Sequence, residues 1–460
     1  MNPTETRQEI SEQIFRAYDI RGIYGKDITP QVAELIGKGL GSYTGVGKTV
    51  AVGRDVRLSG PQLRNAVIKG LVSVGLRVID LGMVTTPIFY WAIPQKGLDG
   101  GVMITASHNP PEWNGFKLCR EKGMIIGQGS GMEEIKEIVF KKKFAQTDVR
   151  NKPQTYRRIL SEYAQFILSK IRIKKKLKVV LDPGNGASAI IAPKLFKQTD
   201  CEVRVINQKP DGNFPSRGPE PKEETLHQLK TEVTKTGADF GVGYDGDGDR
   251  SVYVDDKGRV LTGDAVSVIF SKALIKKKGD KVVLDVSCSL ALEESIIQNG
   301  GTPVVERVGR PYMMGRTLKE GAVFGGERSG HFYFPEIYGI DDGTFASLKM
   351  AEILSAGNLK LSELIDSIPK YYNSTFNVQS PDEHKFAVTK QTKMVFAEKG
   401  YKILDIDGVK ASSSDGWILV RPSNTEPLIR VFVEGKTEAK LKQLLNLAKN
   451  IVEGEVRKFS

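Results

Sequence analysis

The stretch KVVLD at Lys178–Asp182 decides the expected fold, because it recurs unchanged at Lys281–Asp285. Each copy is a short run of branched apolar residues, of the length that one buried strand needs. Residues with helical spacing follow each copy, and the two copies lie about one domain length apart. Although five residues are a short match, this spacing favours two similar α/β units in series.

Other short apolar runs extend this pattern over most of the chain. They occur at 49–53, 101–105, 240–244 and 322–324, and residues with helical spacing follow each of them. Strands that alternate with helices predict mainly parallel sheets with covered faces. After residue 371 the order changes to several short strand-like segments and a closing helix, which predicts an α+β unit.

The sequence therefore predicts four domains. They are three similar mixed α/β domains at residues 1–152, 153–257 and 258–370, and a C-terminal α+β domain at residues 371–460. The first boundary falls in the polar, proline-containing segment KKKFAQTDVRNKPQ, which has the composition of a linker. A chain of 460 residues is long enough for this number of compact domains.

The charge balance indicates an anionic partner but does not name it. The chain has 67 basic and 55 acidic residues and a formal net charge of +12. Nucleic acids and phosphorylated metabolites both fit this charge. Three lysine runs, at 141–143, 174–176 and 276–278, lie far apart without interleaved aromatic residues, which argues against nucleic acid as a partner.

Cysteine usage and hydropathy favour a cytoplasmic location. Cys119, Cys201 and Cys288 are widely separated and form no CxxC pair, so we expect neither a disulfide framework nor a zinc site. The chain has a polar N-terminus and no charge-free apolar run of about 18 residues. We therefore expect neither secretion nor a membrane partner.

A serine follows one of the apolar runs, in the segment GVMITASHNPPEWNGFK. Asn109 and the two prolines after it predict a turn, which would present the Ser107 hydroxyl at the carboxyl end of a strand. Open α/β sheets bind their ligands at this edge. A purely structural turn is the alternative, and the lack of a GxSxG motif argues against a hydrolase triad.

The segment YDGDGDRS predicts a metal site. Asp245, Asp247 and Asp249 alternate with glycine directly after a strand-like run, so that their carboxylates can converge on one hard cation such as Mg²⁺. An EF-hand calcium loop is rejected, because Arg250 and Asp256 stand where that loop has glycine and glutamate. An exposed acidic turn is the alternative.

Two further polar loops follow strand-like runs. In VFGGERSGHFYF, the side chains of Glu327, Ser329 and His331 suit sugar hydroxyls, with a structural turn as the alternative. The segment RPSNTEPLIR carries donors that suit a phosphate group, with a helix-capping turn as the alternative. These donors are Arg421, Ser423, Asn424, Thr425 and Arg430.

Taken together, the motifs resemble the α-D-phosphohexomutase family over almost the whole chain. FRAYDIRG, TASHNP, DGDGDR, GGERSGH and RPSNTEP occur in the family's order and spacing. The resemblance implies three similar mixed α/β domains and a C-terminal α+β domain around a central active-site cleft. DGDGDR with RPSNTEP is similar to the phosphomannomutase/phosphoglucomutase branch, whereas phosphoglucosamine mutases more often read DGDADR and RxSGTEP.

The resemblance also implies a reaction. Phosphate carried on Ser107 would convert hexose 1-phosphate and hexose 6-phosphate, of mannose or glucose, into each other through a hexose 1,6-bisphosphate, which is also the expected activator. Mg²⁺ would be held by the three aspartates together with Ser107. Lys117 and His331 are expected as general acid and base, with Arg21 tuning them. The residues that would add positive charge beside the phosphate are Arg21, His108, Lys117 and Arg250.

The resemblance places a phosphorylated hexose at a defined set of residues. They are Tyr18, Arg250, Arg310, Glu327, Ser329, Arg421, Ser423, Asn424, Thr425 and Arg430. Two positions depart from the branch, since Arg310 stands where histidine is common and Ser287 where lysine is common. The preferred sugar and the oligomeric state therefore stay open. A phosphoglucosamine mutase and a non-catalytic phosphosugar-binding protein are the alternative functions.

Overall fold

The structure, a computed structural model, describes residues 10–149, 151–423 and 427–459. The chain forms two compact units. The first unit comprises the residues up to Thr262 together with Ser329–Ser362, and the second comprises Gly263–Arg328 and the residues from Glu363 onward. The chain thus leaves the first unit after Thr262 and returns to it at Ser329.

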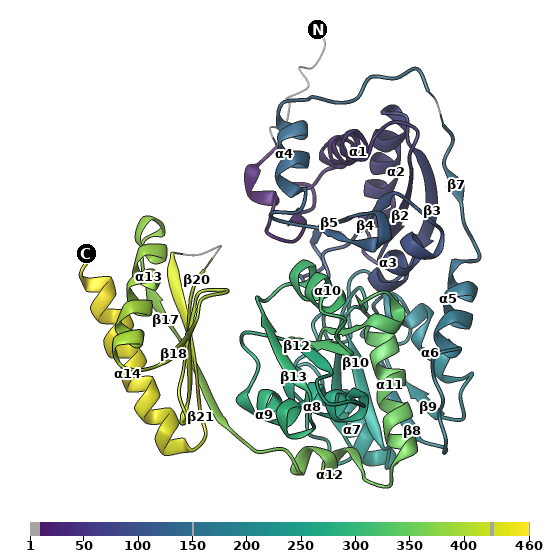
Figure 1. The fold of residues 1–460 in the computed structure, drawn as a ribbon. Helices are drawn as coiled ribbons and strands as arrows, with labels where there is room; N and C mark the ends of the chain where they lie inside the picture. Colours follow the sequence, from purple (N-terminus) through teal and green to yellow (C-terminus); the bar gives the residue numbers. More distant parts are fainter. Residues whose placement is uncertain (1–9, 150, 424–426, 460) are drawn as a thin grey trace. The chain divides into compact units, whose positions relative to one another are not determined.

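The first sheet of the first unit is mixed (Figure 1). Its strand order is β1 (Ile20–Ile23), β5 (Trp113–Arg120), β4 (Gly100–Ile104), β2 (Thr49–Arg54), β3 (Arg77–Met83) and β7 (Gln154–Thr155). Strand β2 pairs in parallel with β3 and β4, whereas β5 runs antiparallel to β4 and β1. Strands β2 and β4 are buried along almost their whole length, as expected for parallel strands covered on both faces.

Helices cover both faces of this sheet. Helix α3 (Thr86–Gln95) lies on one face, where a Cβ atom on Gly101 would approach the Phe89 ring to 2.8 Å. Val102 points to the other face and joins a hydrophobic core of this domain. The helices that pack there are α1 (Pro30–Thr44), α2 (Gly60–Ser73) and α4 (Met132–Phe140). Helix α1 begins after Thr29, whose hydroxyl accepts a backbone N–H of the first turn.

The second sheet of the first unit contains the first KVVLD copy. Its strand order is β11 (Ser251–Asp255), β10 (Phe240–Tyr244), β8 (Lys178–Asp182) and β9 (Glu202–Val205). Strand β8 is the KVVLD copy, and it pairs in parallel with β9 and β10. Strand β11 runs antiparallel to β10. The first unit also contains α5 (Ile159–Leu168), α7 (His227–Thr236), β15 (Phe332–Phe334), β16 (Ile340–Asp341) and α11 (Gly343–Ala356).

The second KVVLD copy has an equivalent place in the second unit. It forms β12 (Lys281–Asp285), which pairs in parallel with β13 (Thr302–Glu306) on one side and β14 (Phe324–Gly326) on the other. The accompanying helices are α8 (Gly263–Leu274), α9 (Leu290–Gln298) and α10 (Arg310–Lys319). Both copies are therefore central strands between two parallel neighbours, a position that selects branched apolar residues.

The C-terminal part of the second unit is an antiparallel sheet with two long helices (Figure 1). Its strand order is β17 (Tyr372–Gln379), β21 (Leu428–Gly435), β20 (Gly416–Pro422), β19 (Val409–Ser412) and β18 (Lys402–Leu404). Helices α13 (Asp382–Glu398) and α14 (Glu438–Arg457) contact each other and the sheet. Leu444, Ala448 and Val452 of α14 are buried in the core that they share.

Mixed α/β sheets followed by an antiparallel α+β unit confirm the predicted fold class. The boundaries between the four domains remain predictions. Within the described ranges, no helix combines the length and the apolar character that crossing a bilayer requires.

Candidate active site

Ser107 lies directly beyond the carboxyl end of β4, as the sequence predicts. Its backbone has φ of 50°, a left-handed conformation that is costly for a residue with a side chain. Its amide donates a hydrogen bond to Thr105 Oγ1 at 2.9 Å. Its hydroxyl donates to Asp245 Oδ2 at 3.0 Å and lies 3.3 Å from His108 Nδ1. The serine is buried, so this orientation is imposed by the protein and not by solvent.

The acidic loop connects β10 to β11 and brings three carboxylates together. Asp245, Asp247 and Asp249 are fully buried, and they offer oxygen atoms within 4.8 Å of one another. The loop needs glycine beside Ser107, because a Cβ atom on Gly246 would lie 2.6 Å from the Ser107 carbonyl oxygen. Burial, followed by repulsion from Asp249 and Asp247, raises the pKa of Asp245 well above its ordinary value.

Lys117 of β5 supplies positive charge to this loop. Its ammonium group donates to Asp247 Oδ2 at 2.7 Å and to Asp249 Oδ2 at 2.6 Å. Asp247 also accepts a hydrogen bond from Thr86 Oγ1 at 2.5 Å. Burial and Asp249 both act to raise the pKa of Asp247, but the ammonium and hydroxyl donors outweigh them and lower it. The ionised form of Asp247 is therefore favoured.

The three carboxylates fit a divalent cation. Asp247 Oδ1 is buried and has no hydrogen-bond partner, which leaves one ligand oxygen uncommitted. Carboxylate oxygens are the ligands that Mg²⁺ and other hard cations prefer. The Ser107 hydroxyl contacts Asp245, so a group attached to Oγ would adjoin the same set. Residues that could hold Mg²⁺ are thus Asp245, Asp247, Asp249 and Ser107.

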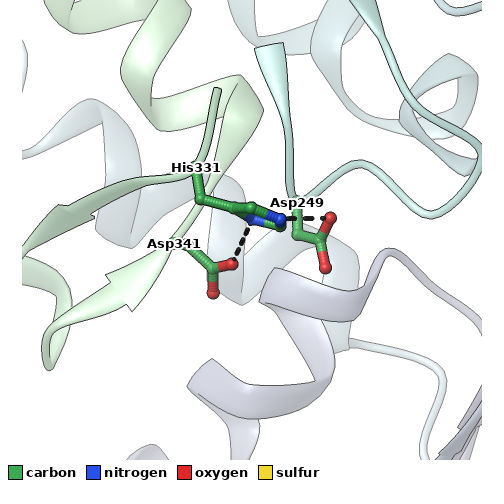
Figure 2. Close-up of side chains that lie close together, drawn as sticks. All are labelled: Asp249, His331 and Asp341. Atoms are coloured by element: carbon green, nitrogen blue, oxygen red, sulfur yellow. Dashed lines mark ion pairs between the residues drawn. The ribbon is translucent and has the colours of Figure 1, made fainter. Parts of the chain in front are cut away.

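His331 lies beside the same acidic loop. Figure 2 shows its ring between Asp249 and Asp341, with Nδ1 2.7 Å from Asp341 Oδ2 and 3.9 Å from Asp249 Oδ1. Nε2 accepts a hydrogen bond from Arg250 Nε at 2.9 Å. Because Nε2 is an acceptor, the proton of the neutral imidazole is assigned to Nδ1, which faces the carboxylates.

Two arginines flank the Ser107 loop. Arg250 donates to His108 Nδ1 at 2.9 Å. Arg21 donates to Asn109 Oδ1 at 2.6 Å and to the Ala106 carbonyl oxygen at 3.3 Å. Burial, together with the charges of Arg250 and Arg21, lowers the pKa of His108, so that this imidazole is neutral near pH 7. The expectation that His108 adds positive charge beside the phosphate is therefore wrong, because two neighbouring cations disfavour its protonation.

The first unit therefore brings all the predicted catalytic and metal residues together. They are Ser107, Lys117, His331, Arg21, His108, Asp245, Asp247 and Asp249, with Arg250. Tyr18, half-buried, and Ser329, exposed, also belong to the first unit. Their predicted substrate roles remain predictions.

Other predicted substrate residues lie in the second unit. Arg310 begins α10, and Glu327 follows β14 and is buried. Arg421 is the last residue but one of β20 and pairs with Asp407 at 2.9 Å, and Ser423, which follows the strand, is buried. Arg430 is an exposed residue of β21. Asn424 and Thr425 lie outside the described residues.

Several residues of the site escaped the sequence analysis. Asp55 and Arg57 follow β2 and are fully buried, and Thr86 begins α3 beside Asp247. Asp341 in β16 faces His331. The usable signal was the segment GRDVR, because charged residues directly after an apolar strand belong to the edge where α/β sheets bind ligands.

Family models match nearly the whole chain. Residues 12–146, 160–258 and 262–372 match the alpha/beta/alpha domains I, II and III of "Phosphoglucomutase/phosphomannomutase". Residues 376–449 match the C-terminal domain of the same family.

Individual proteins are similar over their full length. A phosphoglucomutase/phosphomannomutase of Thermococcus kodakarensis is 36% identical, with 96% of this chain and 98% of the relative covered. A probable phosphoglucosamine mutase of Methanopyrus kandleri is 38% identical, with 94% and 95% covered. The crystal structure of a phosphoglucomutase/phosphomannomutase family protein from Burkholderia thailandensis superposes with a TM-score of 0.90 at 31% identity, with 97% and 98% of the two chains covered.

Proposed function

This chain belongs to the phosphoglucomutase/phosphomannomutase family, and on that premise we propose that it interconverts hexose 1-phosphate and hexose 6-phosphate through a phosphoserine at Ser107. The observation that carries the proposal is the buried Ser107 hydroxyl, which contacts Asp245 of a carboxylate triad. Enzymes of this family are mutases, a class of isomerase. The substrates are phosphorylated hexoses, with mannose and glucose as the first candidates.

The reaction moves a phosphoryl group twice. The phosphate on Ser107 Oγ passes to the free hydroxyl of the sugar phosphate, the O–P bond to serine breaks, and a hexose 1,6-bisphosphate results. After the bisphosphate reorients, its other phosphate returns to Ser107 and leaves the isomeric monophosphate. Added hexose 1,6-bisphosphate would phosphorylate an unloaded Ser107, which explains its role as activator.

Catalysis of this transfer depends on charge and position. Bound Mg²⁺ would offset the negative charge of the phosphoryl oxygens beside Ser107. Lys117 and Arg250 contribute further positive charge, and Arg21 holds the Ser107 loop through Ala106 and Asn109. Water must be kept from the phosphoserine, and the burial of Ser107 serves this purpose.

Proton transfer is assigned to Lys117 and His331. The attacking sugar hydroxyl must lose a proton. When the phosphoryl group is transferred from Ser107 Oγ to the sugar, the serine oxygen must gain a proton. His331 Nε2 is held by Arg250 in the resting enzyme, so Arg250 must exchange this partner for phosphate before Nε2 can accept a substrate proton.

A coupled assay tests the proposed function. Purified enzyme should convert mannose 1-phosphate or glucose 1-phosphate to the 6-phosphate when Mg²⁺ and hexose 1,6-bisphosphate are present. Intact-mass measurement should find one phosphate, and peptide mapping should place it on Ser107. A phosphosugar-binding protein without turnover would contradict the proposal.

Glucosamine phosphate belongs in the same assay. The similarity to a probable phosphoglucosamine mutase of Methanopyrus kandleri is as strong as the similarity to the phosphoglucomutase/phosphomannomutase relatives. If kcat/KM is higher for glucosamine 1-phosphate than for the mannose and glucose phosphates, the protein is a phosphoglucosamine mutase.

Arg310 is expected to influence the choice of sugar. It begins α10 in the domain expected to face the sugar ring, where relatives of this branch commonly have histidine. Arg310→His should therefore change the ratio of kcat/KM for glucose and mannose phosphates, because guanidinium and imidazole present donors differently. Arg316→His is the matched control, since Arg316 lies in the same helix and pairs with Glu320. An unchanged ratio for Arg310→His would exclude a role in discrimination.

Arg421 is expected to bind the phosphate that is not transferred. Hydrogen bonds to a charged group contribute about 1.5 to 3 kcal/mol, so Arg421→Ala should lower kcat/KM about ten- to hundredfold. Because the sugar binds in two orientations, kcat/KM should fall by the same factor for the 1-phosphate and the 6-phosphate substrates. Lys393→Ala is the control, because it removes an exposed ion pair, with Asp405, from the same α+β domain. A lower Tm with unchanged kinetics, or a loss for one isomer alone, would contradict this role.

A further inference from the structure

Arg57 lies in the turn after β2, and its side chain is fully buried beneath the Ser107 loop. One terminal nitrogen, Nη2, donates to the carbonyl oxygens of Ser107 at 2.9 Å and Asn109 at 2.6 Å. The other, Nη1, donates to the carbonyl oxygens of Pro110 at 2.6 Å and Trp113 at 2.9 Å. One guanidinium group thus binds four carbonyl groups of the turn that carries the proposed phosphoserine.

A second set of contacts links Asp55 to the Ser107 amide. Asp55 is fully buried, and its Oδ2 lies 3.2 Å from Arg57 Nε and accepts a hydrogen bond from Thr105 Oγ1 at 2.7 Å. Thr105 Oγ1 in turn accepts the Ser107 N–H at 2.9 Å. Both the amide and the carbonyl of Ser107 are therefore connected to the Asp55–Arg57 pair.

A loop of the second domain encloses the guanidinium group. Its carbon Cζ lies 5.2 Å from the centre of the buried Phe214 ring, a cation–π contact. The backbone of Gly212 lies close to the turn that follows β2, because a Cβ atom on Gly212 would lie 2.6 Å from the Val56 carbonyl oxygen. Arg57 is thus held from both sides and has little space for another rotamer.

These contacts explain how Ser107 keeps its left-handed backbone. Such a conformation persists only when the surroundings over-determine it. Arg57 binds backbone carbonyls of the Ser107 turn, whereas Lys117 and Arg250 contact carboxylate and imidazole side chains of the site. Lysine at this position would keep the charge, but its single ammonium group cannot reproduce a planar fork with four fixed hydrogen bonds.

From this arrangement we infer that Arg57, supported by Asp55, is a positioning residue that holds Ser107 Oγ in the orientation required for phosphoryl transfer. The inference rests on the proposed function, because it concerns the step that Ser107 performs there. A misplacement of about 1 Å can slow such a transfer about a hundredfold. Arg57→Lys should therefore lower kcat about ten- to hundredfold and leave KM for the sugar phosphate unchanged, since Arg57 does not contact the sugar.

A rapid-quench experiment tests the inference. Wild type and Arg57→Lys are phosphorylated with labelled glucose 1,6-bisphosphate, freed of it, and mixed with glucose 1-phosphate in the presence of Mg²⁺. The amplitude of label transfer counts the enzyme that is folded and phosphorylated, and the rate constant reports the transfer itself. Arg64→Lys is the matched control, because Arg64 of α2 donates to Asp80 of β3 and not to the Ser107 loop.

The expected result is a rate constant about ten- to hundredfold lower for Arg57→Lys and unchanged for Arg64→Lys. A normal rate constant with a reduced amplitude would mean that Arg57 serves folding alone, and it would overturn the inference. If Arg57→Lys does not fold, Asp55→Asn replaces it, because this change keeps the shape and removes the charge that orients Arg57. A normal rate constant for folded Asp55→Asn would then overturn the inference. Wild type that carries no transferable phosphate would instead refute the proposed function.

Discussion

Ser107→Ala is expected to abolish mutase turnover and to leave at most about a thousandth of the wild-type kcat, because the reaction has no other place to hold the phosphate. The Ser107 hydroxyl contacts Asp245 Oδ2 at 3.0 Å and His108 Nδ1 at 3.3 Å, two side chains of the site itself, so its removal should change the fold little. A coupled assay measures the turnover, and intact-mass measurement should find no phosphate on the variant.

Ser73→Ala serves as the control for this prediction. Ser73 is the last residue of α2, and its hydroxyl donates to the Gly70 carbonyl oxygen of the same helix, not to the Ser107 loop. Its alanine variant should retain turnover and phosphate. Near-normal turnover of Ser107→Ala, or phosphate that maps to another residue, would show that the proposed relay is wrong.

Asp247→Asn should have the second-largest effect, since it removes the charge of the ligand with an uncommitted oxygen. A bound metal contributes several kcal/mol to such a transfer, so kcat at moderate Mg²⁺ should fall about a hundredfold or more. Affinity for Mg²⁺, measured by calorimetry on the resting enzyme, should weaken as well. Because Lys117 and Thr86 lower the pKa of Asp247, its charge stabilises the fold, and its loss leaves the buried Lys117 with one carboxylate partner fewer. Tm should therefore fall as well, and kcat and Mg²⁺ affinity are compared on folded protein.

Asp99→Asn is the matched control for the metal prediction. Asp99 is a carboxylate of the same compact unit, and it pairs with Lys48 and accepts a hydrogen bond from the Thr49 amide. Its asparagine variant should keep the metal affinity of wild type. Full activity of wild type after removal of metal, verified by elemental analysis, would contradict the metal assignment altogether.

Local sequence patterns predicted much of the fold. The two KVVLD copies are central strands, and the change of pattern after residue 371 is the start of the antiparallel α+β part. Strand β19 has no clear signal in the sequence, because its four residues, VKAS, form too short and too polar a segment to give an apolar run. The sequence also did not predict that the first unit is discontinuous. Hydrophobic periodicity depends on residues that are close in sequence, so it does not show that Ser329–Ser362 pack with the first unit.

The sequence by itself determined the family, the fold class and the loops that carry Ser107 and the aspartates, because these depend on runs, turns and motifs of adjacent residues. Only the tertiary structure decided which distant side chains join them. Lys117 reaches Asp247 across 130 residues, and Arg57 reaches the Ser107 carbonyl across 50. Such pairings follow from strand order, register and the closing of loops over the sheet edge. A buried charge must find partners there, and the spacing of residues along the chain does not reveal which ones.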